Sequence, residues 1–166
     1  MYDRAMCPGS FDPITYGHLD IIRRTARIFD EVVVAVFDNP NKKHFFSCEE
    51  RIELVRASLD STPNVFVERG DGLLVEYARQ RGIRVVIKGL RAVSDFEYEF
   101  QMAQMNRAIA NHVETLFMMT RPEHSYLSSS VVKELAQLGA DVSDMVPESV
   151  VEALKERMVA GEGEVE

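Results

Sequence analysis

Short apolar runs alternate with segments of helical periodicity along most of the chain. The run at 32–37, Val-Val-Val-Ala-Val-Phe, is apolar at every position, which is typical of a strand covered on both faces. Similar runs predict further strands at residues 5–7, 65–68, 85–87 and 115–119. The spacing of polar and apolar positions between and after these strands predicts helices at 17–29, 48–59, 73–81, 94–110, 129–138 and 147–158.

Capping residues mark several of the expected helix ends. Ser47 with Glu50, and Ser94 with Glu97, have the spacing of a capping box at a helix start. Gly82 follows the third expected helix, and glycine readily takes the left-handed conformation that ends a helix. These start and stop signals agree with the periodicity, so the predicted elements rest on two kinds of observation.

Strands that alternate with helices predict right-handed βαβ units. The expected fold class is therefore α/β: a Rossmann-like, doubly wound, five-stranded parallel sheet with helices on both faces. We expect a single domain over residues 1–158, followed by a disordered acidic tail at 159–166. Ligands bind beyond the carboxyl ends of the strands in such sheets, so the loops at that edge are expected to form the site.

Size and charge limit the classes of function. The chain has 166 residues, enough to bury the core of one domain, and its net charge of -8 argues against nucleic acid as the main partner. Two cysteines, Cys7 and Cys48, make neither a disulfide framework nor a metal motif and favour a reducing, cytoplasmic setting. No apolar run is long enough to span a bilayer and no signal peptide is evident, so we expect no membrane association.

The loop at residues 7–18, Cys-Pro-Gly-Ser-Phe-Asp-Pro-Ile-Thr-Tyr-Gly-His, joins the first strand to the first helix. Gly17 lets a phosphate approach the backbone at the helix N-terminus, where N–H groups and the helix dipole favour anions. The imidazole of His18 can donate a hydrogen bond to that phosphate in either its neutral or its protonated form. Ser10 can add a hydroxyl group, although a plain turn serine is the alternative. Asp12 is expected to shape the loop rather than to perform chemistry.

Three further segments at the same sheet edge carry cations or hydroxyl groups. One lysine of the pair at 42–43 is a candidate for an anionic substrate, although a surface lysine pair is ordinarily only solvated. The segment at 88–91, Lys-Gly-Leu-Arg, can clamp phosphate, with a salt-bridged structural turn as the alternative. The serines at 128–130 precede a helix, where they can bind an anion or simply cap the helix.

Several common enzyme motifs are missing from the sequence. There is no G-x-x-x-x-G-K-[ST] loop, which argues against a P-loop NTPase. There is no G-x-G-x-x-G after a strand, so a nicotinamide-dependent dehydrogenase has little support. Neither the H-E-x-x-H motif of metalloproteases nor the G-x-S-x-G motif of serine hydrolases occurs.

Four sequence blocks resemble the bacterial phosphopantetheine adenylyltransferase family, in an order and spacing that cover about residues 4–158. The Thr-x-Gly-His motif at 15–18 is similar to the signature of the wider nucleotidyltransferase superfamily. The Lys-Gly-Leu-Arg segment followed by Asp-Phe-Glu-Tyr-Glu at 95–99 is more specific to the family. The other blocks are Lys-Lys at 42–43 with Glu-Glu-Arg at 49–51, and Tyr-Leu-Ser-Ser-Ser at 126–130.

The resemblance implies transfer of the adenylyl group of ATP to 4′-phosphopantetheine, which gives dephospho-coenzyme A and pyrophosphate in the penultimate step of coenzyme A synthesis. It implies that His18 stabilises the transition state, with Lys42 and Arg91 as further catalytic cations. The implied phosphopantetheine-binding residues are Ser10, Lys42, Leu74 and Lys88. The implied ATP-binding residues are Ser10, Phe11, His18, Gly89, Leu90, Arg91, Glu99, His124, Ser125, Tyr126, Leu127, Ser128, Ser129 and Ser130.

The resemblance also implies a cofactor, an assembly and a regulator. Mg²⁺ is expected to bind mainly through the nucleotide, and no protein side chain is expected to ligate a metal. A homohexamer is implied, and coenzyme A is a candidate feedback inhibitor. Lys88 stands where many family members have arginine, so a bidentate phosphate contact is replaced by a point charge.

The chemistry implied by the resemblance needs no strong general base. A phosphate monoester is already anionic near neutral pH, because its second pKa is about 6. We therefore expect direct in-line displacement without a covalent enzyme intermediate. The closest alternatives are nucleotidyltransferases of the nicotinamide-mononucleotide or glycerol-phosphate type. A non-catalytic nucleotide sensor that has kept the pocket is the alternative from another class of protein.

Overall fold

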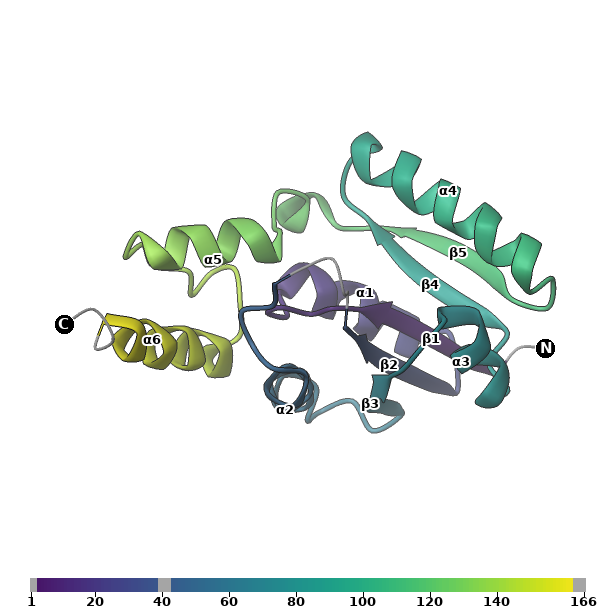
Figure 1. The fold of residues 1–166 in the computed structure, drawn as a ribbon, viewed down its shortest axis with the longest axis horizontal. Coiled ribbons are helices and arrows are strands. Elements are labelled where there is room, and N and C mark those ends of the chain that lie inside the picture. Colours follow the sequence, from purple (N-terminus) through teal and green to yellow (C-terminus); the bar gives the residue numbers. More distant parts are fainter. Residues whose placement is uncertain (1–2, 39–42, 163–166) are drawn as a thin grey trace.

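The computed structural model describes residues 3–38 and 43–162, which fold around a single five-stranded sheet (Figure 1). Its strands are β1 (Arg4–Gly9), β2 (Glu31–Phe37), β3 (Val65–Gly70), β4 (Val85–Leu90) and β5 (Glu114–Met119). All neighbouring pairs run parallel, in the order β3-β2-β1-β4-β5. The predicted fold class is therefore confirmed, and each predicted strand is present with one or both ends extended.

Helices cover both faces of this sheet. They are α1 (Tyr16–Ala26), α2 (Cys48–Ser58), α3 (Leu74–Gln80), α4 (Val93–Ile109), the 3₁₀ helix η1 (Pro122–His124), α5 (Ser129–Gln137) and α6 (Glu148–Glu162). Ala5 and Cys7 of β1 belong to the core that includes α1 and α2, whereas Met6 belongs to the core on the α3 face. Figure 1 shows α1 behind the sheet and α3 in front of it. Alternate residues of the apolar strands thus fill opposite cores, as expected for a sheet covered on both faces.

The start of α4 differs from the prediction. The N-cap is Ala92, which makes no side-chain capping bond, so Ser94 does not begin the helix as its spacing to Glu97 predicted. The carboxylate of Asp95 instead accepts the backbone N–H of Arg91 (3.3 Å) and the Nε–H of its guanidinium (2.9 Å). An acidic side chain in the first turn therefore joins the helix to the preceding loop in place of a capping serine.

The last helix extends beyond its predicted end at Met158. Helix α6 continues to Glu162, so residues 159–162, which the sequence assigned to a disordered tail, are helical. No proline interrupts this stretch, and the helical hydrogen bonding therefore has no stop signal at Met158. Residues 163–166 lie outside the described residues.

Both cysteines, Cys7 and Cys48, are buried free thiols. Burial raises the pKa of Cys7 to about 12, so this thiol stays protonated at neutral pH. Across residues 3–38 and 43–162, no helix combines the length and the apolar character needed to cross a membrane.

Candidate active site

The loop after β1 brings Phe11 next to His18 at the carboxyl edge of the sheet. Phe11 has a left-handed backbone conformation with φ 48°, and its ring folds back over Gly9. A Cβ atom at Gly9 would lie 3.0 Å from that ring, so glycine makes the room that the ring occupies. The rings of Phe11 and His18 then meet edge to face, with their centroids 5.2 Å apart.

His18 is held by a capping box at the start of α1. The backbone N–H of Thr15 donates to Nδ1 of His18 (3.1 Å), and the Thr15 hydroxyl accepts the backbone N–H of His18 (3.4 Å). Because Nδ1 accepts a hydrogen bond, the proton of the neutral ring lies on Nε2. Burial, and then the charge of Arg91, lower the pKa of His18 to about 4. The imidazole is therefore neutral at physiological pH and has Nε2–H as its donor.

Arg91 joins the end of β4 to the segment that precedes α5. Its guanidinium pairs with the carboxylate of Asp95 (2.9 Å) and donates to the carbonyl oxygen of Leu127 (2.8 Å). The same positive charge contributes to the lowered pKa of His18. The end of β4 therefore lies close enough to the imidazole for the charge of Arg91 to act on it.

The segment that precedes α5 packs directly on the start of α1. Ser129 donates from its hydroxyl to the carbonyl oxygen of Pro13 (2.7 Å). A Cβ atom at Gly17 would lie 3.6 Å from the carbonyl oxygen of His124. The rings of Tyr16 and His124 are stacked, with their centroids 6.4 Å apart. The first turn of α1 and this segment therefore form adjoining walls of the site.

The other predicted ATP contacts of this segment have different surroundings. Ser128 is the N-cap of α5 and accepts a backbone N–H of the first helical turn (3.1 Å), as the capping interpretation predicted. The Ser125 hydroxyl donates to a backbone carbonyl of η1 (2.8 Å). Leu127 is buried, whereas Tyr126 and Ser130 are exposed. Ser130 is therefore more accessible to a ligand than the residue that caps the helix.

Lys88 and Glu99 form an ion pair in which Nζ lies 3.1 Å from a carboxylate oxygen. The resemblance assigned Lys88 to phosphopantetheine and Glu99 to ATP, so two predicted ligand contacts are partners of each other. A Cβ atom at Gly89 would lie 3.0 Å from Ile21, and glycine therefore lets β4 approach α1 closely. Leu90, the next predicted ATP contact, is buried.

Arg51 ties the loops after β1 and β2 to the start of α2. Its side chain is fully buried, and its guanidinium donates to the carbonyl oxygens of Ser10 (2.7 Å) and Phe37 (3.2 Å). It also pairs with the carboxylate of Asp38. Ser10 is therefore fixed through its backbone by a residue of the neighbouring layer.

Asp12 anchors the loop after β1, the role that the sequence indicated. Its carboxylate accepts the backbone N–H groups of Phe45 (2.9 Å) and Phe46 (2.9 Å) and a proton of the Lys133 ammonium (2.7 Å). Burial alone would raise the pKa of Asp12, but these donors outweigh it and lower the pKa. The loop is thus joined to the approach to α2 and also to α5.

The remaining predicted phosphopantetheine contacts are Lys42 and Leu74. Lys42 lies outside the described residues, so the role assigned to it stays a prediction. Its neighbour Lys43 is exposed. Leu74 opens α3 and is partly buried against the core on that face of the sheet.

Sequence reasoning missed the structural roles of Thr15, Arg51 and Lys133. Thr15 is followed by His18 and not by the Glu or Gln that usually completes a capping box, yet the imidazole takes that part. A threonine three residues before any acceptor side chain is the signal that would have found it. Arg51 and Lys133 bind partners 41 and 121 positions away, so no local spacing reveals them.

Comparison with known sequences identifies the family. The chain matches the cytidylyltransferase-like family over residues 6–135. It is 58% identical over 159 residues to the phosphopantetheine adenylyltransferase of Frankia casuarinae, covering 93% of this chain and 98% of that protein. The protein of the same name from Symbiobacterium thermophilum is 53% identical over 154 residues, covering 93% of this chain and 95% of that one.

A solved structure with a related name has the same fold. The nicotinic acid mononucleotide adenylyltransferase of Plasmodium falciparum, complexed with NaAD, superposes with a TM-score of 0.71 at 12% identity. The superposition covers 94% of this chain and 96% of that one, and at such low identity it shows the fold alone. The sequence identities are far higher and extend over nearly the whole length, and on them the chain belongs to the phosphopantetheine adenylyltransferase family of cytidylyltransferase-like proteins.

Proposed function

We propose that the protein transfers the adenylyl group of ATP to 4′-phosphopantetheine, giving dephospho-coenzyme A and pyrophosphate. The observation that carries this proposal is the hydrogen bond from the backbone N–H of Thr15 to Nδ1 of His18, which leaves Nε2–H of the imidazole as its donor. The relatives named phosphopantetheine adenylyltransferase support the choice of substrates, because they match 93% of this chain.

The reaction depends on positioning and charge neutralisation. The acceptor phosphate is an anionic nucleophile near neutral pH, because its second pKa is about 6. One of its oxygens attacks the α-phosphorus of ATP, forming a new P–O bond while the bond to the leaving pyrophosphate breaks in line with it. His18 donates from Nε2–H to phosphate oxygens on which negative charge grows, and Arg91 adds a fixed positive charge. Labelled ATP is expected to leave no adenylyl group on the protein, since the displacement is direct.

ATP is proposed to lie between the start of α1, the end of β4 and the segment that precedes α5. Arg91 holds the last two together through the carbonyl oxygen of Leu127. Ser129, the first residue of α5, holds the start of that helix to the loop after β1. These contacts support a nucleotide site formed by Ser10, Phe11, His18, Gly89, Leu90, Arg91, Glu99 and residues 124–130.

Phosphopantetheine is proposed to contact Ser10, Lys42, Leu74 and Lys88. The ammonium of Lys88 is paired with Glu99 at 3.1 Å, so an incoming phosphate has to compete with that carboxylate. A lysine can turn from one partner to the other, because its three donors sit on a flexible stem. Glu99 therefore favours binding only of an acceptor that carries a strong negative charge.

Mg²⁺ is proposed to enter the site with ATP. Among residues 3–38 and 43–162, no three His, Cys, Asp or Glu side chains are grouped as metal ligands. The imidazole, guanidinium and hydroxyl donors around His18 suit phosphate oxygens, and Mg²⁺ commonly takes phosphate oxygens and water as its ligands. When bound, the ion would neutralise charge on the leaving pyrophosphate. Removal of Mg²⁺ with a chelator is expected to abolish turnover and to leave the melting temperature of the ligand-free protein unchanged.

A homohexamer is proposed because the family resemblance implies it, and the large apolar side chains that the described part of the chain exposes along two neighbouring elements support a contact between chains. The residues are Phe96, Tyr98, Phe100, Met105 and Ile109 on α4, and Leu116 and Met119 on β5. Clusters of exposed apolar side chains mark contact surfaces. Sedimentation equilibrium at micromolar concentration is expected to give six chains, and a monomer would contradict the proposal.

A cytoplasmic location and feedback by coenzyme A complete the proposal. Two buried free cysteines are consistent with a reducing compartment. Coenzyme A contains both the pantetheine and the adenine-nucleotide portions of the product, so it is proposed to compete for the same site. Its inhibition is then expected to be relieved by saturating phosphopantetheine.

The substrate assignment is tested by pyrophosphate release with a panel of acceptors. Phosphopantetheine is expected to give turnover, while nicotinamide mononucleotide, nicotinate mononucleotide and glycerol phosphate give none. Turnover with one of these and not with phosphopantetheine would overturn the assignment. Calorimetric binding of ATP without pyrophosphate formation would indicate a nucleotide sensor.

A further inference from the structure

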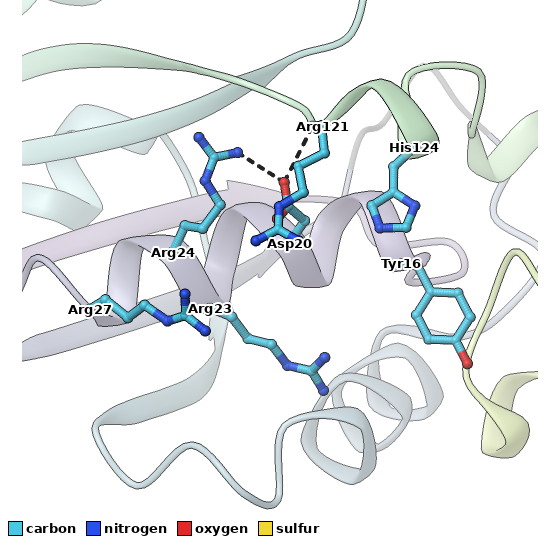
Figure 2. Close-up of a pocket in the computed structure, with 7 residues that line it drawn as sticks. All are labelled: Tyr16, Asp20, Arg23, Arg24, Arg27, Arg121 and His124. Atoms are coloured by element: carbon cyan, nitrogen blue, oxygen red, sulfur yellow. Dashed lines mark hydrogen bonds and ion pairs between the residues drawn. The ribbon is translucent and has the colours of Figure 1, made fainter.

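A second cationic site lies along the outer side of α1. A pocket of about 200 Å³ is lined there by four arginines: Arg23, Arg24 and Arg27 of α1, and Arg121 of the segment after β5. Figure 2 shows Arg24 and Arg121 turned toward Asp20, while Arg23 and Arg27 extend along the near side of the helix. The pocket thus concentrates positive charge on a chain whose net charge is -8.

The carboxylate of Asp20 neutralises only part of this charge. It lies 2.9 Å from the guanidinium of Arg24 and 3.0 Å from that of Arg121. Glu123 is a weaker partner, 3.8 Å from Arg121. Neither Arg23 nor Arg27 has a carboxylate partner among the described residues, although Arg23 donates to a backbone carbonyl of α2 (3.2 Å). The four guanidinium groups outnumber the carboxylates beside them and repel one another, and an anion would relieve that repulsion.

The rings of Tyr16 and His124 form the end of the pocket nearest the first turn of α1 (Figure 2). His18, Lys88 and Arg91 do not line it, so its cations are separate from those of the proposed active site. The two sites are nevertheless neighbours, because α1 and the segment that begins at His124 contribute to both.

We propose that this pocket binds a small polyphosphate group, with at least two adjacent phosphates. Guanidinium groups match phosphate in geometry as well as charge, because the planar fork of arginine donates two parallel hydrogen bonds. Sites for drug-sized ligands have volumes of about 300–1,000 Å³, and a pocket of about 200 Å³ suits a diphosphate or triphosphate group better than a whole nucleotide. The ligand is either free pyrophosphate or the triphosphate end of a nucleotide whose base stays outside.

A bound polyphosphate would bridge α1 and the segment at 121–124. Arg121 already links these two elements through Asp20, and the ligand would add a further link between them. Since α1 carries His18 and the other segment leads to Leu127, the ligand would stiffen two walls of the proposed active site. Binding at the pocket is nevertheless a separate event from substrate binding and is measured separately.

The test is isothermal titration calorimetry of the full chain with pyrophosphate, in the presence of a chelator that removes divalent cations. The Arg91→Ala substitution weakens pyrophosphate binding at the proposed active site. In this variant, pyrophosphate is still expected to bind at the arginine pocket. Adding Arg23→Glu and Arg27→Glu is expected to weaken this binding at least tenfold, since charge-assisted hydrogen bonds to the phosphates are lost and repelling carboxylates take their place. Lys155→Glu, an exposed cation of α6, is the matched control and should leave the isotherm unchanged.

Two further arms decide the outcome. If circular dichroism shows that the charge-reversal variant is unfolded, Arg23→Gln with Arg27→Gln replaces it, because glutamine removes the positive charge without adding a negative one. ATP is titrated beside pyrophosphate, each with and without the Arg23 and Arg27 substitutions: weaker pyrophosphate binding shows that the free anion suffices, and weaker binding of ATP alone indicates the triphosphate end of a nucleotide. Loss of all binding in Arg91→Ala, or the same isotherm with and without the Arg23 and Arg27 substitutions, would show a merely solvated arginine face and overturn the proposal.

Discussion

The backbone N–H of Thr15 donates to Nδ1 of His18 across 3.1 Å, and this one bond decides what the imidazole can do. A ring whose Nδ1 accepts must carry its proton on Nε2 when it is neutral. The capping box that begins α1 therefore also sets the tautomer of the proposed transition-state donor. A helix-start signal and a catalytic signal overlap in the same four residues.

His18→Ala is expected to lower kcat by about 10²–10³, or about 2.7–4 kcal/mol in the barrier, as for the loss of one preorganised donor. The KM values for both substrates should change much less, because the donor acts chiefly on charge that develops during the reaction. Steady-state pyrophosphate release measures the effect, and a thermal melt checks that the variant folds. Normal turnover in a folded His18→Ala protein would remove this residue from the mechanism.

Thr15→Ala is expected to cost about 0.5–2 kcal/mol in the free energy of unfolding, because the side-chain cap of α1 is lost. It should also lower kcat, since the imidazole loses its hydroxyl neighbour at 3.1 Å. Ser47→Ala is the matched control: Ser47 caps α2 in the same way but lies in another helix. Urea unfolding should show similar losses for both variants, with kcat reduced only for Thr15→Ala.

Stability is expected to fall as the pH is lowered from about 6.5 toward 4, with His18 as one cause. Its pKa is about 4 in the folded chain, against an ordinary value of 6.5. Below pH 6.5 the unfolded chain therefore binds a proton that the folded chain does not, and unfolding is favoured. Asp12 and Glu50, whose pKa values are lowered on folding, lose their contributions at still lower pH.

The contribution of His18 is isolated by comparison with His18→Gln. The difference in the free energy of unfolding between the two proteins should change between about pH 6.5 and about pH 4 and be flat above that range. Urea titrations at several pH values provide the measurement. A constant difference across the whole range would mean that the folded ring titrates normally.

Arg51→Met is expected to destabilise the fold by about 3–5 kcal/mol, the usual effect of removing one partner of a buried ion pair. The carbonyl oxygens of Ser10 and Phe37 would lose their shared donor, and Asp38 its cation. Arg56→Met on the same helix is the control, because its ion pair with Glu53 is exposed and should contribute about 0–1 kcal/mol. Equal melting temperatures for the two variants would show that the buried guanidinium does not hold the loops.

Lys42→Ala is expected to raise the KM for phosphopantetheine more than the KM for ATP, because the resemblance assigns Lys42 to the acceptor. Lys43→Ala provides the control, since it removes the neighbouring exposed charge and keeps Lys42. Initial rates with each substrate varied in turn separate the two constants. Equal increases for both substrates, or an increase for ATP alone, would contradict the assignment.

The strands and the site edge could be predicted because their signals are local. The continuous apolar run of β2 has no polar position that could face water, so only a strand covered on both sides suits it. Ser47 and Glu50 likewise make their capping box within one turn, and the structure contains it. The order of strands and helices then placed the loops at one edge, because parallel connections are right-handed.

The contacts that fix the site could not be predicted because they join distant parts of the chain. Lys133 reaches Asp12 and Arg51 reaches Ser10 only after the sheet and its helices have packed. The start of α4 was predicted wrongly for a related reason: Asp95 binds Arg91 in the folded chain, and the helix begins at Val93 with Ala92 as its N-cap. Local spacing predicts elements, whereas partner choice depends on the finished packing.

The position of Arg51 has a dynamic consequence. Because one guanidinium serves the loops after β1 and β2, fraying of the first turn of α2 would release both in a single event. Amide hydrogens near Ser10 and near Asp38 are then expected to exchange with deuterium at matched rates, as members of one cooperative unit. The loops on two sides of the proposed active site would thus open together, and a buried side chain rather than either substrate would control that opening.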